Sequence, residues 1–229
     1  MIRLDNVSKF FVTRKGRKYI LNDVSLEIPS GLNVGVLGRN GAGKSTFMRL
    51  LAGVDTPNSG TISTSYDMSW PMGLAQGLQV AMTGRENARF VCRILGTPRD
   101  EVAGKLAFIE EFAEIGDYID MQVRTYSSGM RARLNFAISM AFDFDCYLID
   151  ELTSVGDKGF REKSRQALLD KKDRSNFLKI SHNLAELEAE CDSGLILEHG
   201  EVFYFEEIAE AVRCYNEYIV ASTNARRAS

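Results

Sequence analysis

Residues 38–46 limit what this chain can fold into more than any other segment. They read Gly-Arg-Asn-Gly-Ala-Gly-Lys-Ser-Thr, which fits the phosphate-loop pattern of glycine, four residues, then Gly-Lys-Ser/Thr. The apolar run Val34–Leu37 before them is typical of a short buried strand, and residues 47–51 after them are typical of an apolar-faced helix. Strand, glycine loop and helix in this order are the context in which the pattern is meaningful.

The residue types of the loop suit a nucleoside triphosphate. Glycines let the backbone curve around an anion so that N–H groups point inward, and the start of the helix adds partial positive charge. Lys44 offers a full charge to the outer phosphates, and the Ser45 hydroxyl offers an oxygen ligand to Mg²⁺. The loop therefore predicts triphosphate binding but does not say what hydrolysis would drive.

Composition and charge narrow the class of protein. The 229 residues, 45% hydrophobic and 26% charged, are typical of one globular domain or of a core with a smaller lobe. A net charge of −3 argues against nucleic-acid binding. No apolar run approaches the ~20 residues that cross a bilayer, and no signal-peptide pattern follows Met1. We expect a cytosolic protein whose four separate cysteines are small buried side chains.

Alternating and helical patterns place the loop in an α/β fold. Residues 1–36 are predicted to be rich in strands, including 2–7 and 24–28, with a basic turn at 13–18. Further short strands are predicted at 61–63, 68–70, 146–150, 177–181 and 194–197. Residues 83–142 have a helical pattern, and a last helix carries Ile208 and Val212. Strands separated by helices after a phosphate loop predict a mainly parallel sheet.

Three further motifs carry groups able to act on a nucleotide. The strand at 146–150 ends in Asp150 and Glu151, placed to hold Mg²⁺ and to orient or deprotonate a water. Residues 127–129, Ser-Ser-Gly, precede a predicted helix and are either an N-cap or a second anion site. His182 follows an apolar strand, where a lone histidine is more often structural than catalytic.

In this order the motifs resemble those of the nucleotide-binding subunits of ATP-binding cassette (ABC) transporters. Residues 38–46 resemble Walker A, 149–151 resemble Walker B with its catalytic glutamate, and 126–130, Tyr-Ser-Ser-Gly-Met, resemble the family signature. Residues 154–157 fall at the expected D-loop, and His182 at the switch histidine. The resemblance implies an α/β P-loop NTPase fold with a mainly parallel core sheet, an N-terminal antiparallel β subdomain and an inserted α-helical subdomain.

The resemblance covers about residues 2–205 and implies a single nucleotide-binding domain over residues 1–229. The core is expected at about 1–82 and 143–205, the helical subdomain at about 83–142, and a C-terminal helix and tail at about 206–229. Catalysis is assigned to Glu151, His182 and Lys44, and Mg²⁺ to Ser45 and Asp150. The residues expected to contact ATP are Phe11, Gly38, Arg39, Asn40, Gly41, Ala42, Gly43, Lys44, Ser45, Thr46, Gln79, Ser127, Ser128, Gly129 and Asp157.

Two assignments keep alternatives. The aromatic ring that stacks on adenine is expected at Phe11, with Phe10 and Tyr19 as the other candidates. The glutamine of the Q-loop is either Gln76 or Gln79, of which Gln79 better resembles the subgroup described next.

A narrower resemblance is to the ATPase subunits of bacterial polysaccharide exporters, above all those for capsular polysaccharide. It rests on residues 69–71, 83–87 and 126–134. Ser128 and Met130 depart from the usual Leu-Ser-Gly-Gly-Gln signature, and both are expected in this subgroup. Exporters of O-antigen or teichoic acid share Thr-Gly-Arg-Glu-Asn and Tyr-Ser-Ser-Gly-Met, and many carry an added C-terminal domain. The length of this chain leads us to expect the capsule group.

The resemblance also implies partners. Two subunits form a head-to-tail homodimer in which each ATP lies between one phosphate loop and the other subunit's signature. Permease subunits embedded in the membrane, further polysaccharide export machinery and no nucleic acid are expected, at the cytoplasmic face of the bacterial inner membrane. The helical lobe and residues 74–82 are the expected docking surface for the permease, with local packing as the alternative. The apolar side chains in and around this loop are Met72, Leu74, Leu78, Val80 and Met82.

Other functions fit less well. A soluble ABC protein of DNA repair or translation usually carries a long coiled-coil insertion or a second cassette, and this sequence shows neither. A regulatory module without turnover is disfavoured by intact Lys44, Asp150 and Glu151. The hypothesis of a small GTPase leaves residues 126–130 unexplained, and the guanine-binding pattern Asn-Lys-x-Asp is absent from the sequence.

Overall fold

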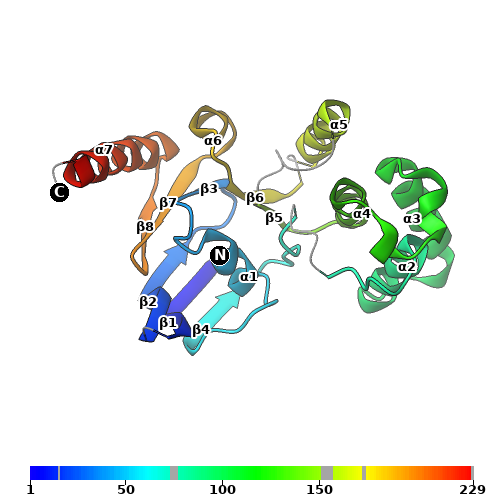
Figure 1. Ribbon diagram of the computed structural model, residues 1–229, viewed down its shortest axis with the longest axis horizontal. Helices are drawn as coiled ribbons and strands as arrows, with labels where there is room; N and C mark the ends of the chain where they lie inside the picture. Colours follow the sequence, from blue (N-terminus) through cyan, green and yellow to red (C-terminus); the bar gives the residue numbers. More distant parts are fainter. Residues whose placement is uncertain (15, 73–76, 151–156, 172–173, 228–229) are drawn as a thin grey trace. The chain divides into compact units, whose positions relative to one another are not determined.

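The computed structural model describes residues 1–14, 16–72, 77–150, 157–171 and 174–227 (Figure 1). The chain divides into two compact units. The first consists of Met1–Pro71, Asp145–Glu151 and Ser175–Ser229, and the second of Met72–Phe144 and Leu152–Arg174.

An antiparallel sheet opens the first unit. Its strands are β1 (Ile2–Thr13), β2 (Gly16–Ile28) and β4 (Ser59–Thr64), in the order β2-β1-β4. Ile2 and Leu4 are buried while Arg3 between them is exposed, which confirms the predicted alternation. The predicted basic turn is shorter than expected, because β1 continues to Thr13 and β2 begins at Gly16.

A mainly parallel sheet forms the core of the first unit, as predicted. It contains β3 (Val34–Leu37), β5 (Cys146–Asp150), β6 (Asn176–Ile180), β7 (Ser193–Glu198) and β8 (Glu201–Phe205), in the order β5-β6-β3-β7-β8. The first four strands are parallel, and β8 returns antiparallel to β7. β8 is not among the strands that the residue pattern predicted.

The strand predicted at 68–70 is wrong. The segment forms a single parallel bridge from Met68 to Cys146. Its hydrogen bonds come from Ser69, which is fully buried: the Ser69 N–H donates to the Cys146 carbonyl oxygen at 3.0 Å, and the Leu148 N–H donates to Ser69 Oγ at 2.9 Å. The Ser69 side chain takes the place of the next backbone hydrogen bond to β5. The alternating pattern therefore reflects packing beside β5 rather than a strand.

Helices cover both faces of the core sheet. On one face, α1 (Lys44–Leu51) packs its apolar side chains among residues of β1, β2 and the core strands. On the other face, α6 (Leu184–Glu190) and α7 (Ile208–Arg227) pack against β3 and β7. Gly35 and Gly194 are register partners on this face, and a Cβ on Gly194 would lie 2.4 Å from the Ala211 Cβ, so glycine lets α7 approach the sheet. In the described part of the chain no helix, including α7, is long and apolar enough to cross a membrane.

The second unit is helical, as predicted for most of residues 83–142. It contains α2 (Gly84–Ile94), α3 (Arg99–Ala113), α4 (Ser128–Met140) and α5 (Lys158–Leu169), with 3₁₀ turns at Gly116–Asp120 and Val123–Thr125. Aromatic rings join three of the helices. The Phe112 ring of α3 lies 5.9 Å from the Phe136 ring of α4 and 5.8 Å from the Phe160 ring of α5, between centroids.

Candidate functional site

The loop at 38–46 joins β3 to α1 and has the backbone of a tight curl. Gly41 and Gly43 have φ angles of 82° and 106°, in the region that favours glycine. Gly43 is the N-cap of α1, and a Cβ on it would lie 2.3 Å from Ile20 Cγ2 of β2. The predicted sequence of strand, glycine loop and helix is confirmed, and the antiparallel sheet supports the loop through Ile20.

The loop surrounds the ammonium group of Lys44. Lys44, in the first turn of α1, is 9% exposed, and its ammonium donates to the carbonyl oxygens of Gly38 at 2.6 Å and Arg39 at 3.2 Å. A positive side chain, positive-φ glycines and a helix N-terminus therefore meet at one point. This combination attracts and orients anions, phosphates above all.

Three chemical groups follow strands at one edge of the core sheet. Val36 of β3 pairs with Ile180 of β6, and Ile180 pairs with Asp150 of β5, in parallel register. The phosphate loop and the turn with His182 therefore come directly after β3 and β6, and Asp150 is the last residue of the neighbouring β5. All three lie at the carboxyl edge, where ligands of open α/β sheets bind. Asp150 is 7% exposed, and His182 is exposed. Glu151, the predicted base, lies outside the described residues.

Two oxygen donors of this edge fit a magnesium ion. Ser45 lies in the first turn of α1, Asp150 ends β5, and these two elements contact each other. Hydroxyl and carboxylate oxygens are hard ligands of the kind that Mg²⁺ prefers, and a phosphate-bound Mg²⁺ needs only one or two of them. The donor set suits the expected metal.

Three aromatic side chains are the candidates for stacking on adenine. The Phe10 ring is covered, since the Arg17 guanidinium carbon lies 4.5 Å and the Tyr19 ring 5.3 Å from its centroid. Phe11 is 47% exposed and Tyr19 is 38% exposed. The exposed ring of Phe11 favours it for stacking on a base, and the assignment stays a prediction.

The signature segment begins a helix. Ser127 is the N-cap of α4, and its Oγ accepts a hydrogen bond from the Met130 N–H at 3.2 Å. The N-cap interpretation of this serine is therefore correct. Ser127 and Ser128 are exposed, so the start of α4 faces solvent, and the second interpretation stays compatible because an anion site uses the same helix N-terminus.

The Thr-Gly-Arg-Glu-Asn motif at 83–87 begins α2. Thr83 and Glu86 form a capping box, with hydrogen bonds of 3.1 and 2.8 Å. A Cβ on Gly84 would lie 2.6 Å from the hydroxyl oxygen of Tyr126, the first signature residue. Burial raises the pKa of that hydroxyl, which donates to the Tyr118 carbonyl oxygen. Two of the three segments that carried the narrower resemblance, 83–87 and 126–134, are thus in direct contact.

Asn87 completes the motif by holding the backbone of Gln79. Its Oδ1 accepts from the Gln79 N–H at 2.7 Å, and its Nδ2 donates to the carbonyl oxygens of Gln79 at 3.1 Å and Thr83 at 2.8 Å. Asn87 is 2% exposed, whereas the Gln79 side chain is exposed. Gln76, the other Q-loop candidate, lies outside the described residues. The motif is visible in the sequence, but this role of Asn87 is not, because the contact with Gln79 depends on the fold.

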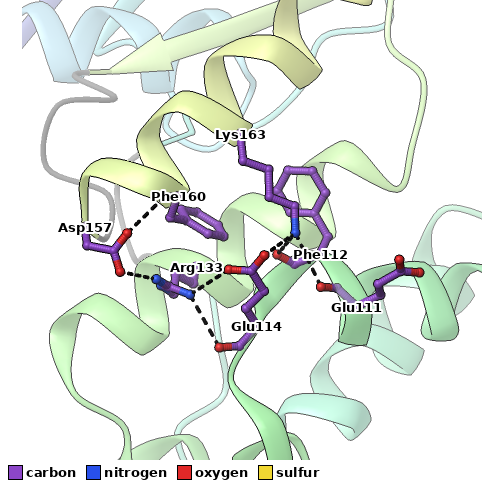
Figure 2. Close-up of polar contacts among 7 residues, drawn as sticks. All are labelled: Glu111, Phe112, Glu114, Arg133, Asp157, Phe160 and Lys163. Carbon is purple, nitrogen blue, oxygen red and sulfur yellow. Dashed lines mark hydrogen bonds and ion pairs between the residues drawn. The ribbon is translucent and has the colours of Figure 1, made fainter.

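Asp157 lies at the start of α5 (Figure 2). Its Oδ1 accepts from the Phe160 N–H at 3.0 Å, and this hydrogen bond is the main reason why the pKa of its carboxyl lies below the ordinary value. Its Oδ2 accepts from Arg133 of α4 at 2.7 Å, and the Arg133 guanidinium carbon lies 4.6 Å from the Phe160 ring centroid. The described end of the predicted D-loop is therefore tied to the signature helix; residues 154–156 lie outside the described ranges.

Glu114 extends this contact to a third helix. It follows α3 in a left-handed conformation, with φ of 51°. Its carboxylate accepts from Lys163 of α5 at 2.7 Å and from Arg133 at 3.3 Å (Figure 2). Neither the role of Arg133 nor that of Glu114 could be predicted from the sequence, because no local pattern shows that the end of α3 lies beside α4 and α5.

The predicted site residues fall in both units. The phosphate loop, Asp150 and His182 belong to the first unit, where the sheet register brings them to one edge. Gln79, the residues at 127–129 and Asp157 belong to the second unit.

Comparisons with protein families and with individual proteins agree with one another. Residues 21–154 match the protein family described as ABC transporter. The polysialic acid transport ATP-binding protein KpsT of Escherichia coli is 46% identical, over 95% of this chain and 97% of that protein. The capsule polysaccharide export ATP-binding protein CtrD of Neisseria meningitidis serogroup B is 43% identical, over 94% of this chain and 99% of that protein.

A more distant relative and a solved structure extend the comparison. The O-antigen export system ATP-binding protein RfbB of Klebsiella pneumoniae is 39% identical, over 91% of this chain and 84% of that protein. A dimeric structure of the ATP-binding cassette MJ0796, in a post-hydrolysis state with ADP and Pi, superposes with a TM-score of 0.75 at 21% identity, over 91% of this chain and 99% of that chain. At that identity the likeness shows the fold.

Proposed function

This chain belongs to the ABC transporter family, and on that premise we propose that its site hydrolyses ATP to energise export of a capsular polysaccharide across the bacterial inner membrane. The observation that carries the proposal is the similarity, over nearly the whole chain, to proteins named for polysialic acid transport and capsule polysaccharide export. The alternative cargo is an O-antigen or teichoic-acid glycan.

The chemistry is phosphoryl transfer to water, which needs charge neutralisation and a positioned nucleophile. We assign Lys44 and the loop N–H groups to the phosphates. Ser45 and Asp150 would hold Mg²⁺, which would supply further positive charge to neutralise the phosphates. Glu151 takes the proton of the attacking water and His182 orients the reacting groups; a positioned base contributes ~10²–10⁴-fold in rate.

The second half of the site is assigned to another copy of the chain. The exposed start of α4 at 127–129 and Asp157 then meet the ATP held by the opposite phosphate loop. This homodimer joins permease subunits at the cytoplasmic face of the membrane. In the expected docking region, Met72 is fully buried and so packs locally, whereas Val80 is 54% exposed and fits contact with a permease. Leu74 lies outside the described residues.

To test this function, the gene for this chain is replaced in the cell by one that encodes the Glu151→Gln variant. We expect ATP to bind, dimers to accumulate, turnover in the assembled transporter to fall at least about a hundredfold, and capsular polysaccharide to remain inside the cell. Glu188→Gln is a matched control, since Glu188 is an exposed residue of α6. Near-normal turnover of Glu151→Gln would refute the catalytic role, and retention of a different glycan would replace the capsule assignment.

A further inference from the structure

A buried lysine lies directly behind the turn that carries His182. Lys179 is in β6 and is 5% exposed, while Leu178 and Ile180 on either side of it pack into the hydrophobic core. Because successive strand residues point to opposite faces, Lys179 and Ser181 share the face that α6 covers. A buried ammonium is unfavourable unless it is paired with an opposite charge.

Two carboxylates of α6 pair with this ammonium. Lys179 Nζ lies 2.6 Å from Glu186 Oε1 and 2.5 Å from Glu190 Oε2. Glu186 and Glu190 are one helical turn apart, a spacing at which like charges repel. Lys179 offsets that repulsion and fixes α6 to the sheet beside the turn.

The same network reaches both neighbours of His182. Glu186 Oε2 accepts from Ser181 Oγ at 2.8 Å, and Ser181 Oγ in turn accepts from the Asn183 N–H at 3.1 Å. Asn183 Oδ1 accepts from the Glu186 N–H at 3.3 Å and so caps α6. The Ser181 side chain before His182 and the Asn183 N–H after it are therefore held in one hydrogen-bond network that includes Glu186.

We propose that Lys179, Glu186 and Ser181 are positioning residues for His182. Lys179 holds Glu186 in the orientation that accepts the Ser181 hydroxyl, and this hydrogen bond fixes the turn between β6 and α6 (Figure 1). The inference rests on the proposed role of His182 in hydrolysis. Displacing a reacting group by 1 Å can slow a reaction ~10²-fold, so the effect belongs in kcat rather than in ATP affinity.

The first experiment compares Ser181→Thr with Ser181→Val. Threonine and valine have nearly the same shape, but only threonine keeps the hydroxyl that donates a hydrogen bond to Glu186. We expect Ser181→Val to lower kcat about tenfold with a change in KM for ATP below about twofold, and Ser181→Thr to keep kcat within about twofold of wild type. Equal kcat values for the two variants would overturn the proposal.

The second experiment asks whether the network acts through His182. In the His182→Ala background, Ser181→Val and Lys179→Met should cause no further loss of kcat, because residues that act through one group are not additive. Adding Glu186→Gln to Lys179→Met should recover kcat to within about threefold of wild type, since the amide oxygen still accepts a hydrogen bond from the Ser181 hydroxyl and no longer repels the Glu190 carboxylate. If Ser181→Val and Lys179→Met lower kcat by the same factor in wild type and in His182→Ala, the substitutions act through general stability and the proposal is overturned.

A third measurement needs no turnover. The chain has two histidines, His182 and His199, so side-chain NMR of labelled histidine gives two signals, with His199 as the internal control. Ser181→Val should shift or broaden the His182 signal and leave that of His199 unchanged. An unchanged His182 signal would overturn the positioning role, whereas a wild-type protein that does not hydrolyse ATP would contradict the proposed function.

Discussion

Single residues of the phosphate loop are constrained by space as well as by chemistry. Gly41 and Gly43 both have positive φ, but their surroundings differ. A Cβ on Gly41 would meet no atom within 4 Å, whereas a Cβ on Gly43 would lie 2.3 Å from Ile20 Cγ2. Both glycines fit the motif, yet only Gly43 is required by a contact with another part of the fold.

We therefore expect Gly43→Ala to destabilise the protein more than Gly41→Ala. Each substitution places an L-residue at positive φ, which costs about 1–2 kcal/mol, and the clash with Ile20 adds about 1–3 kcal/mol at Gly43 alone. Urea unfolding of the two variants at pH 7 measures the difference. Equal free energies of unfolding would mean that the loop moves away from β2 at little cost.

At the scale of elements, charges hold three helices of the second unit together. Arg133 of α4 and Lys163 of α5 both donate to the Glu114 carboxylate at the end of α3 (Figure 2). The hydrogen bond from Lys163 is the main reason why the pKa of Glu114 lies below its ordinary value of 4.5. The folded state thus favours the ionised carboxylate, and this contribution to stability is present above the unfolded-state pKa.

It follows that acid should weaken this helical contact. As the pH falls from about 5 to 3, wild type should lose the Glu114 contribution, and Glu114→Gln should show a smaller loss over the same range. The difference should stay below about 1 kcal/mol, because the side chain is 49% exposed and water screens the pair. Glu111→Gln is the control, since the Glu111 carboxylate points away from the cluster (Figure 2). A pH dependence in Glu114→Gln equal to that of wild type would contradict the assignment.

At the scale of the whole molecule, the site residues are divided between two units. The phosphate loop, Asp150 and His182 lie in the first unit, and the residues at 127–129 lie in the second. In the proposed dimer each ATP draws the first set from one copy and the second set from the other. Activity should then depend on association of two chains.

We expect turnover per chain to rise with protein concentration in the dilute range and to level off once dimers prevail. The physical reason is that a lone chain offers the phosphates only one half of the charge-stabilising groups. Measuring ATP hydrolysis across a dilution series, with molecular mass followed by light scattering, checks this. A constant turnover per chain while the protein is monomeric would rule out the shared site.

Local patterns were enough for much of the fold. Continuous apolar runs predicted β3 and β5, and alternation predicted the start of β1, because burial on one or both faces of a strand leaves a direct mark in sequence. The same rule failed at 68–70, where the buried Ser69 forms the contacts with β5. It also missed β8, whose exposed and half-buried residues carry a weak apolar signal.

The chemistry of the phosphate loop, the acidic end of β5 and the order of the motifs were determined by the sequence itself, because each depends on residues adjacent in the chain. Only the tertiary structure decided that Asn87 holds Gln79, that Arg133 joins Asp157 to Glu114, and that a buried Lys179 lies behind His182. These contacts join residues whose pairing is set by helix packing and strand register. A charged side chain alone does not reveal its partner, since its energy depends on which groups the folded chain brings within a few ångströms.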